Sequence, residues 1–232
     1  MLQFLLDLVF PKKCVGCRRV GSYVCVNCAS FIEEYSAYVC PVCLKNSITG
    51  QTHPGCKTPY GIDGLCSGVV YKGVVKKLVF RFKYPPYLHD LHGIVGKIFI
   101  EMISQNEQFM RLLPQHPIVI PIPLSSYKLK KRGYNQAELL SKSLAKEFHL
   151  EINTYLIRIT NTKPQFTLNK VSRFKNVKDA FKFKGDKKVL TNATVLLVDD
   201  LATSCATLRE CAKVLKRAGA REVYGVTFAR EI

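Results

Sequence analysis

Four pairs of metal-binding residues lie close together near the N-terminus and constrain the fold more than any other feature. Within each pair two residues separate the potential ligands, and the pairs are Cys14 and Cys17, Cys25 and Cys28, Cys40 and Cys43, and His53 and Cys56. A two-residue gap forms a tight turn that points both side chains at one ion, and two such turns complete a tetrahedral zinc site. The four pairs therefore predict two zinc ions.

The way in which the pairs share the two ions has alternatives. Sequential sharing puts residues 14–28 around one ion and residues 40–56 around the other, as in two stacked zinc ribbons, whereas interleaved sharing would combine distant pairs. Cys66 lies in a β-rich run, where we expect a buried, small apolar side chain, with replacement of His53 as a ligand the alternative. A disulfide framework is the competing interpretation, but we find no secretion signal to favour it.

The cysteine-rich segment has few long apolar side chains, which indicates the role of these ions. Such a segment cannot fold by burying a core, so the metal supplies the folding energy. Four protein ligands per ion leave no position open for water, which argues against zinc catalysis. We therefore predict a structural double zinc ribbon over residues 1–64 and a second domain over residues 65–232.

Neither a membrane span nor a signal peptide is expected at the N-terminus. The apolar run over residues 2–10 is interrupted by Asp7 and is shorter than the ~20 residues that a span needs. Lys12 and Lys13 follow the run, whereas a signal peptide has its basic residues first. We expect a cytoplasmic protein, and its formal net charge of +18 predicts an anionic partner.

Beyond residue 64 the hydrophobic periodicity alternates between strands and helices. Helical spacing covers residues 73–82 and 91–103, and further helices are expected from Asn135 and over residues 207–218. Short β-rich runs lie near residues 67, 118, 155, 194 and 222. This alternation predicts an α/β fold with a parallel sheet and helices on both faces. Residues 160–178 look least regular, and we expect a long mobile loop there.

The segment over residues 195–207, VLLVDDLATSCAT, carries the clearest chemistry. Its apolar strand would bring Asp199 and Asp200 to the carboxyl edge of the sheet, where open α/β folds bind ligands, and we expect Asp200 to be exposed there. The turn that follows offers backbone N–H groups and hydroxyls at the start of a helix, which suits a phosphate; it contains Thr203, Ser204, Cys205, Ala206 and Thr207.

This segment resembles the phosphoribosyl diphosphate signature of the type I phosphoribosyltransferases. The resemblance implies that Asp199 and Asp200 hold the ribose hydroxyls and that residues 203–207 cradle the 5-phosphate. Together with the cysteine pairs, PIPLSSYKLKKRGYNQAELLSKSLA over residues 121–145 and QFTLNKVSRFKNVKDAF over residues 165–181 resemble the ComF family of competence-associated proteins. The resemblance spans essentially the whole chain.

The ComF resemblance implies a type I phosphoribosyltransferase-like domain behind the zinc ribbon. Lys130, Lys131 and Arg132 become candidate pyrophosphate contacts, and Gln165 and Arg173 belong to a flexible loop over the site. The implied ligand is phosphoribosyl diphosphate with Mg²⁺, and the acceptor, to be recognised by residues 67–117, is not indicated. The implied biology is DNA uptake in natural transformation, with single-stranded DNA and a DNA-uptake helicase or related protein as partners.

One residue departs from the family pattern, because Cys205 stands where the phosphate loop usually has glycine. A β-carbon there hinders the approach of the backbone to phosphate, so we expect weaker phosphate binding. A cysteine at a helix N-terminus could also have a lowered thiol pKa and respond to oxidation. The alternatives to a transferase are a non-enzymatic protein that handles single strands and a zinc-dependent adaptor with a vestigial pocket.

Overall fold

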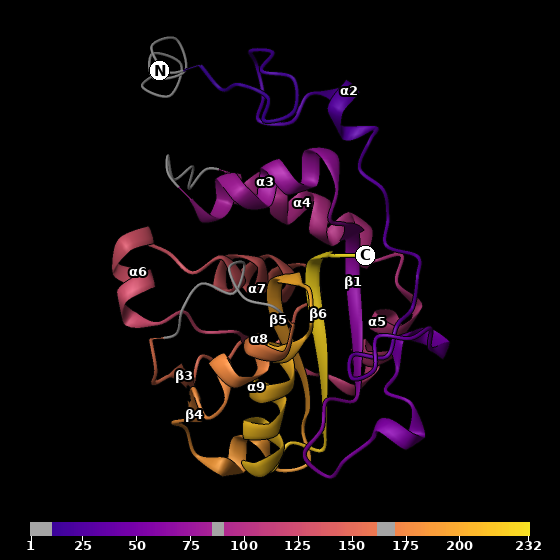
Figure 1. Ribbon diagram of the computed structural model, residues 1–232, viewed down its shortest axis with the longest axis vertical. Helices are drawn as coiled ribbons and strands as arrows, with labels where there is room; N and C mark the ends of the chain where they lie inside the picture. The colour runs from indigo at the N-terminus through magenta and orange to yellow at the C-terminus, as the bar shows by residue number, and fades with distance from the viewer. Residues whose placement is uncertain (1–10, 85–90, 162–169) are drawn as a thin grey trace.

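A parallel four-stranded sheet forms the centre of the computed structural model, which describes residues 11–84, 91–161 and 170–232 (Figure 1). The strand order is β1-β6-β5-β2, with β1 at Gly64–Val70, β6 at Glu222–Arg230, β5 at Thr194–Ala202 and β2 at Ile118–Pro121. All three pairings are parallel, which confirms the predicted α/β architecture. No helix within the described ranges has the length and apolar character needed to cross a membrane.

The central strand β5 shows why its sequence is apolar without interruption. Val195 and Leu197 pack into the hydrophobic core on one face of the sheet, whereas Leu196 and Val198 pack into the core on the other. Successive side chains of a strand point to opposite faces, so a strand covered on both sides needs apolar residues at every position. The same alternation continues through Asp199 and Asp200 near the end of β5, so these two side chains lie on opposite faces of the sheet.

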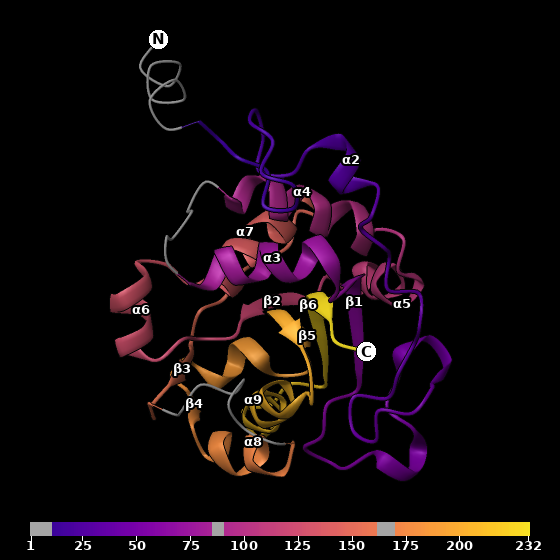
Figure 2. The ribbon, with the colours of Figure 1, turned by 45° about the horizontal axis from the view of Figure 1, so that its top comes forward.

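Helices from the first part of the domain and from its middle cover one face. They are α3 at Gly73–Lys83, α4 at Leu91–Ile103 and α7 at Gln136–Glu147, with α5 at Glu107–Leu112 and η3 at Leu113–Gln115 beside them (Figure 2). The predicted face of α3 is buried as expected, from Val74 near its start to Phe82 near its end. The helix expected from Asn135 is α7, and the Asn135 side chain caps its N-terminus.

The opposite face is covered by α9 at Ala206–Arg217, α8 at Lys170–Val177 and a small antiparallel sheet of β3, Leu156–Arg158, with β4, Phe181–Phe183. Two expectations are corrected here. The run at Tyr155 supplies β3 rather than a strand of the main sheet. The expected loop over residues 160–178 contains α8, because Phe174 and Val177 give this highly basic segment an apolar side that packs into the core.

The cysteine-rich segment lies along the sheet as an extended strip with short helices α2, Val26–Ala29, η1, Ile48–Gly50, and η2, Pro54–Cys56. Between its two cysteine groups the strip pairs with the outer edge of β1, since Val70 N–H donates to Glu33 O and Tyr35 N–H donates to Gly68 O, both at 2.9 Å. The first group lies beside α3, and the second lies near the start of β1, where Gln51 bridges to Gly64. The groups are thus separated rather than stacked, as Figures 1 and 2 show.

The other sheet edge, that of β2, is also covered. Val119 N–H donates to Glu151 O at 2.8 Å, and Asn153 N–H donates to Val119 O at 2.9 Å. After β2 the chain enters the short helix α6 at Ser126–Arg132, which stops at Gly133 with a positive φ of 79°. A turn of this kind favours glycine, so the RGYNQ segment places a basic helix end next to the carboxyl edge of the sheet.

Candidate functional site

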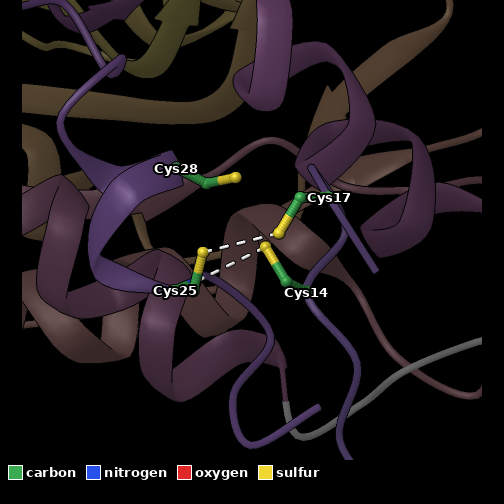
Figure 3. Close-up of side chains that lie close together, drawn as sticks. All are labelled: Cys14, Cys17, Cys25 and Cys28. Atoms are coloured by element: carbon green, nitrogen blue, oxygen red, sulfur yellow. Dashed lines mark hydrogen bonds between the residues drawn. The ribbon is translucent and has the colours of Figure 1, made fainter. Parts of the chain in front are cut away.

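The first cysteine group has the geometry of a tetrahedral metal site. Figure 3 shows the sulfurs of Cys14, Cys17, Cys25 and Cys28 converging on one point, and the four ligand atoms lie within 4.8 Å of one another. The Cys17 and Cys25 sulfurs are 3.6 Å apart. Zn–S bonds of about 2.3 Å in a tetrahedron require sulfurs about 3.8 Å apart. The residues therefore fit zinc.

The second group contains Cys40, Cys43, His53 and Cys56, so each group takes its ligands from consecutive pairs as sequential sharing predicts. His53 Nδ1 lies 3.3 Å from Cys43 Sγ. Its Nε2–H donates to the carbonyl of Asn46 at 2.9 Å, which leaves the Nδ1 lone pair for a metal. Cys66 belongs to neither group and is fully buried in the core, as expected.

The thiol pKa values show what a metal would do in each group. Burial raises the pKa of Cys14, but backbone N–H groups of Cys17, Cys25 and Gly16 outweigh it and lower the pKa to about 6. Hydrogen bonding to Cys14 and burial raise the pKa of Cys28 to about 12. The thiols thus compete for protons, and a dication at their centre would deprotonate all of them. Each of the two groups could therefore hold a zinc ion.

A pocket of about 450 Å³ lies at the carboxyl edge of the sheet, within the usual range of roughly 300 to 1,000 Å³ for small-molecule sites. It collects side chains that are far apart in the sequence. They come from the ends of β1 and α3, the loop after β2, α6, the start of α7, β3, α8, the end of β5 with the turn into α9, and the residue after β6. Both acids of the sequence motif, Asp199 and Asp200, line it.

Asp200 faces the α3 side of β5 and is buried, with 4% of its surface exposed, which corrects the expectation of an exposed acid. Lys83, the last residue of α3, places Nζ 2.8 Å from Asp200 Oδ1. Burial would lower the pKa of Lys83, but the negative charges of Asp200 and Asp199 outweigh it and raise the pKa. Asp200 Oδ2 is buried without a hydrogen-bond partner in the described part of the chain.

Asp199 faces the α9 side of the strand and differs in its ionisation. Burial and the neighbouring charge of Asp200 raise the pKa of Asp199 to about 7, although Lys83 acts in the opposite direction. An Asp199 carboxylate oxygen also accepts the backbone N–H of Asp200 at 2.9 Å. One acid therefore has a permanent cationic partner, and the other exchanges its proton near neutral pH.

Two arginines donate hydrogen bonds to the turn before α9. The Arg230 guanidinium donates to Thr203 O and, at 3.2 Å, to Cys205 Sγ, and Arg173 Nη1 donates to Thr203 Oγ1 at 2.9 Å. Arg230 is buried, with 3% exposure, and has no carboxylate partner within the described ranges. Thr203 and Thr207 line the pocket, whereas Ser204, Cys205 and Ala206 are buried behind it.

Cys205 occupies the left-handed region with φ of 59°, which explains why a glycine would suit this position. The thiol does not have the lowered pKa considered from the sequence. Burial raises the pKa of Cys205 and outweighs the opposing charge of Arg230. A buried thiol with a raised pKa is a poor redox centre. Cys211, on α9, is a fully buried core residue, as expected.

Of the predicted pyrophosphate contacts, Lys131 and Arg132 line the pocket, whereas Lys130 is exposed outside it. Arg173 lines the pocket from α8, and Gln165 lies outside the described residues. Sequence reasoning missed three cations of the pocket: Lys83, Lys128 and Arg158. Burial and the charges of Arg158, Arg132 and Lys83 lower the pKa of Lys128 to about 8. Their basic character alone gave no signal, because basic residues are spread over the whole domain.

Comparison with known proteins places the chain in a family. No profile of a known protein family matches it. It is 32% identical over 227 residues to the DNA utilization protein YhgH of Salmonella typhimurium, a match that covers 93% of this chain and 96% of the relative. The protein of the same name from Escherichia coli O157:H7 is 31% identical over 224 residues, with the same coverage. The chain belongs to the ComF family.

More distant ComF-family members match over similar lengths. Competence protein F of Haemophilus influenzae is 27% identical over 213 residues, which is 90% of this chain and 86% of the relative. At this coverage the similarity to ComF-family members extends over both the cysteine-rich strip and the α/β domain. The similarity therefore covers the segments that contain the two cysteine groups and the pocket.

Proposed function

We propose that the pocket binds the magnesium complex of phosphoribosyl diphosphate. The observation that carries the proposal is the arrangement around β5, where two acids stand beside a turn into α9 and face cations from four other elements. Asp199 and Asp200 would accept hydrogen bonds from ribose hydroxyls. The hydroxyls of Thr203 and Thr207, and N–H groups at the start of α9, would hold the 5-phosphate.

The charge of the pocket supports a polyanionic ligand. Its wall carries six basic side chains, Lys83, Lys128, Lys131, Arg132, Arg158 and Arg173, against the three acids Asp199, Asp200 and Glu231. Burial, and after it repulsion from the charges of Arg158, Arg132 and Lys83, lowers the pKa of Lys128. A bound diphosphate would relieve this repulsion, so the charge arrangement favours its binding. Lys131 and Arg132 are the candidates for pyrophosphate contact.

Phosphoribosyl transfer is the reaction that such a complex could support. The bond between the anomeric carbon and pyrophosphate breaks while the acceptor supplies the electron pair for the new bond, and the transition state has oxocarbenium character. Magnesium bound with the ligand would neutralise part of the charge on the leaving group. The protein contributes placement and a fixed cationic surface for the departing pyrophosphate, and no protein nucleophile is required.

The biological setting that we propose is DNA uptake in the cytoplasm, with zinc ions as structural elements in both cysteine groups. The names of the relatives, competence protein and DNA utilization protein, support this setting. A second candidate function is non-enzymatic handling of single-stranded DNA, with a DNA-uptake helicase or related protein as partner. The observation that favours it is the formal net charge of +18.

Calorimetric titration of magnesium phosphoribosyl diphosphate into the zinc-loaded protein tests the proposal. We expect binding that is lost in Asp199→Asn and Asp200→Asn and that depends on magnesium. No binding to the wild-type protein would refute it. The same titration with an oligodeoxynucleotide at two salt concentrations tests the second candidate. Binding of a single strand weakens as salt rises, and the logarithm of the binding constant falls against the logarithm of the salt concentration with a slope of about −0.7 per phosphate contact.

A further inference from the structure

We infer that Lys83 is a positioning residue of the pocket, which holds one oxygen of Asp200 and leaves the other for a hydroxyl of the ligand sugar. The inference rests on the proposed function and adds a residue from outside the sequence motif to it. Lys83 lies more than one hundred residues before Asp200 in the chain, and the fold brings the two side chains into contact.

The contact has the geometry of a largely buried ion pair rather than of an ion pair on the surface. Lys83 Nζ and Asp200 Oδ1 are 2.8 Å apart, and their side chains are 22% and 5% exposed. Asp200 Oδ2 is buried and has no hydrogen-bond partner among the described residues. An unsatisfied buried oxygen is costly, and a ligand hydroxyl that donates to it would remove this cost.

The end of α3 is fixed, which gives Lys83 a defined position. The carbonyl of Phe82 accepts two hydrogen bonds from buried side chains, from Tyr134 Oη–H at 3.1 Å and from Gln136 Nε2–H at 2.6 Å. Phe82 itself is 1% exposed and packs its ring against Tyr134 at 5.8 Å between centroids. The ammonium group that follows is therefore delivered to the acid pair by a rigid helix end.

Lys83 also acts on the second acid. The charged and titratable groups around the acid pair come from every neighbouring element, and they are Tyr71, Lys83, Tyr84, Lys128, Arg132, Arg158, Arg173, Cys211 and Glu231. Among them Lys83 has the principal lowering effect on the pKa of Asp199. Loss of its charge should raise this pKa further above 7, so that the pair holds its proton more tightly when ligand arrives.

The test compares Lys83→Met and Lys83→Arg with the wild-type protein, all loaded with zinc. Lys146→Met is the control, because Lys146 is an exposed lysine on α7, outside the pocket. Titration of ¹³C-labelled aspartate carboxyl groups, with Asp199→Asn as assignment standard, follows the Asp199 midpoint without ligand. We expect this midpoint to rise in Lys83→Met and to stay unchanged in Lys146→Met. An unchanged midpoint in Lys83→Met would overturn the inference.

Binding supplies the second arm. We expect Lys83→Met to bind magnesium phosphoribosyl diphosphate about fivefold more weakly at pH 7, because a rise of the Asp199 pKa by about one unit from about 7 would reduce its ionised fraction from about one half to about one tenth, with recovery at higher pH. Lys83→Arg should restore most of the affinity, since it restores the charge. An affinity loss that is the same at every pH and is not rescued by arginine would show a merely structural role. Failure of the wild-type protein to bind would refute the proposed function, and the midpoint would still decide the effect of Lys83.

Discussion

Replacement of Gly16 by alanine should damage the first zinc site without touching any of its ligands. Gly16 lies inside the turn between Cys14 and Cys17, and an added β-carbon would stand 2.6 Å from Cys28 Sγ and 3.2 Å from Cys28 Cβ. Ordinary contact distances are about 3.5 to 4.0 Å. The Cys28 sulfur would have to retreat by about 1 Å, whereas metal sites tolerate deviations of about 0.2 Å in a bond of about 2.3 Å.

The size of the effect follows from this displacement. We expect zinc affinity of the first group to fall about 10- to 100-fold, as for perturbations that displace a ligand without removing it, or about 1.4 to 2.7 kcal/mol. The metal-free protein should be affected little, because a free cysteine side chain can rotate away from the new methyl group. The second group should keep its affinity.

Competition with a chromophoric chelator measures the affinity of the two sites, and metal analysis gives their stoichiometry. Gly55→Ala is the matched control, because Gly55 lies in the corresponding turn between His53 and Cys56 and has no atom within 4 Å of an added β-carbon. It should bind zinc like the wild type. Equal affinities in Gly16→Ala, Gly55→Ala and the wild type would refute the steric reasoning.

Three further predictions follow from burial, ionisation and ligand identity. Phe82→Ala should lower the free energy of unfolding by about 3 to 5 kcal/mol and Phe80→Ala by less than about 1 kcal/mol in chemical denaturation, because these α3 side chains are 1% and 53% exposed. The raised pKa of Asp199, about 7, means that the folded protein binds the extra proton between about pH 4 and 7 and loses stability as pH rises through this window. Asp199→Asn should therefore raise the melting temperature considerably more at pH 8 than at pH 5, and the same change at both would contradict this assignment. Cys40→Ser should lose one of two zinc ions and melt earlier, whereas Cys66→Ser should keep both by metal analysis, because only Cys40 lies in a ligand group.

Local patterns in the sequence were sufficient for much of the fold. The cysteine spacing predicted both ligand groups, and the helical periodicity of residues 73–82 predicted the buried face of α3. It failed for α8, where a run of basic residues masks the two apolar side chains that anchor the helix. The β-rich run at Tyr155 was assigned to the wrong sheet, because strand pairing depends on distant partners and not on the strand's own sequence.

The pocket was predictable only in part, for a similar reason. Asp199, Asp200 and the following turn are contiguous, so the motif is visible in one segment. Lys83, Arg158 and Arg230 reach the same region from α3, β3 and β6, and their positions depend on how these elements pack. The interpretation of Asp200 as an exposed acid was wrong because the lysine that covers it could not be placed from sequence.

The strip that joins the two cysteine groups has a further consequence for the sheet it borders. All seven residues of β1 are buried, and its outer edge is paired by residues 33–35. Zinc bound in both groups would fix the strip at both ends, so loss of the metal would release this cover and leave hydrogen-bonding groups of β1 unpaired. An open apolar edge accepts strands from other chains. Metal starvation should therefore lead to self-association as well as local unfolding, and bound zinc would protect the protein against aggregation.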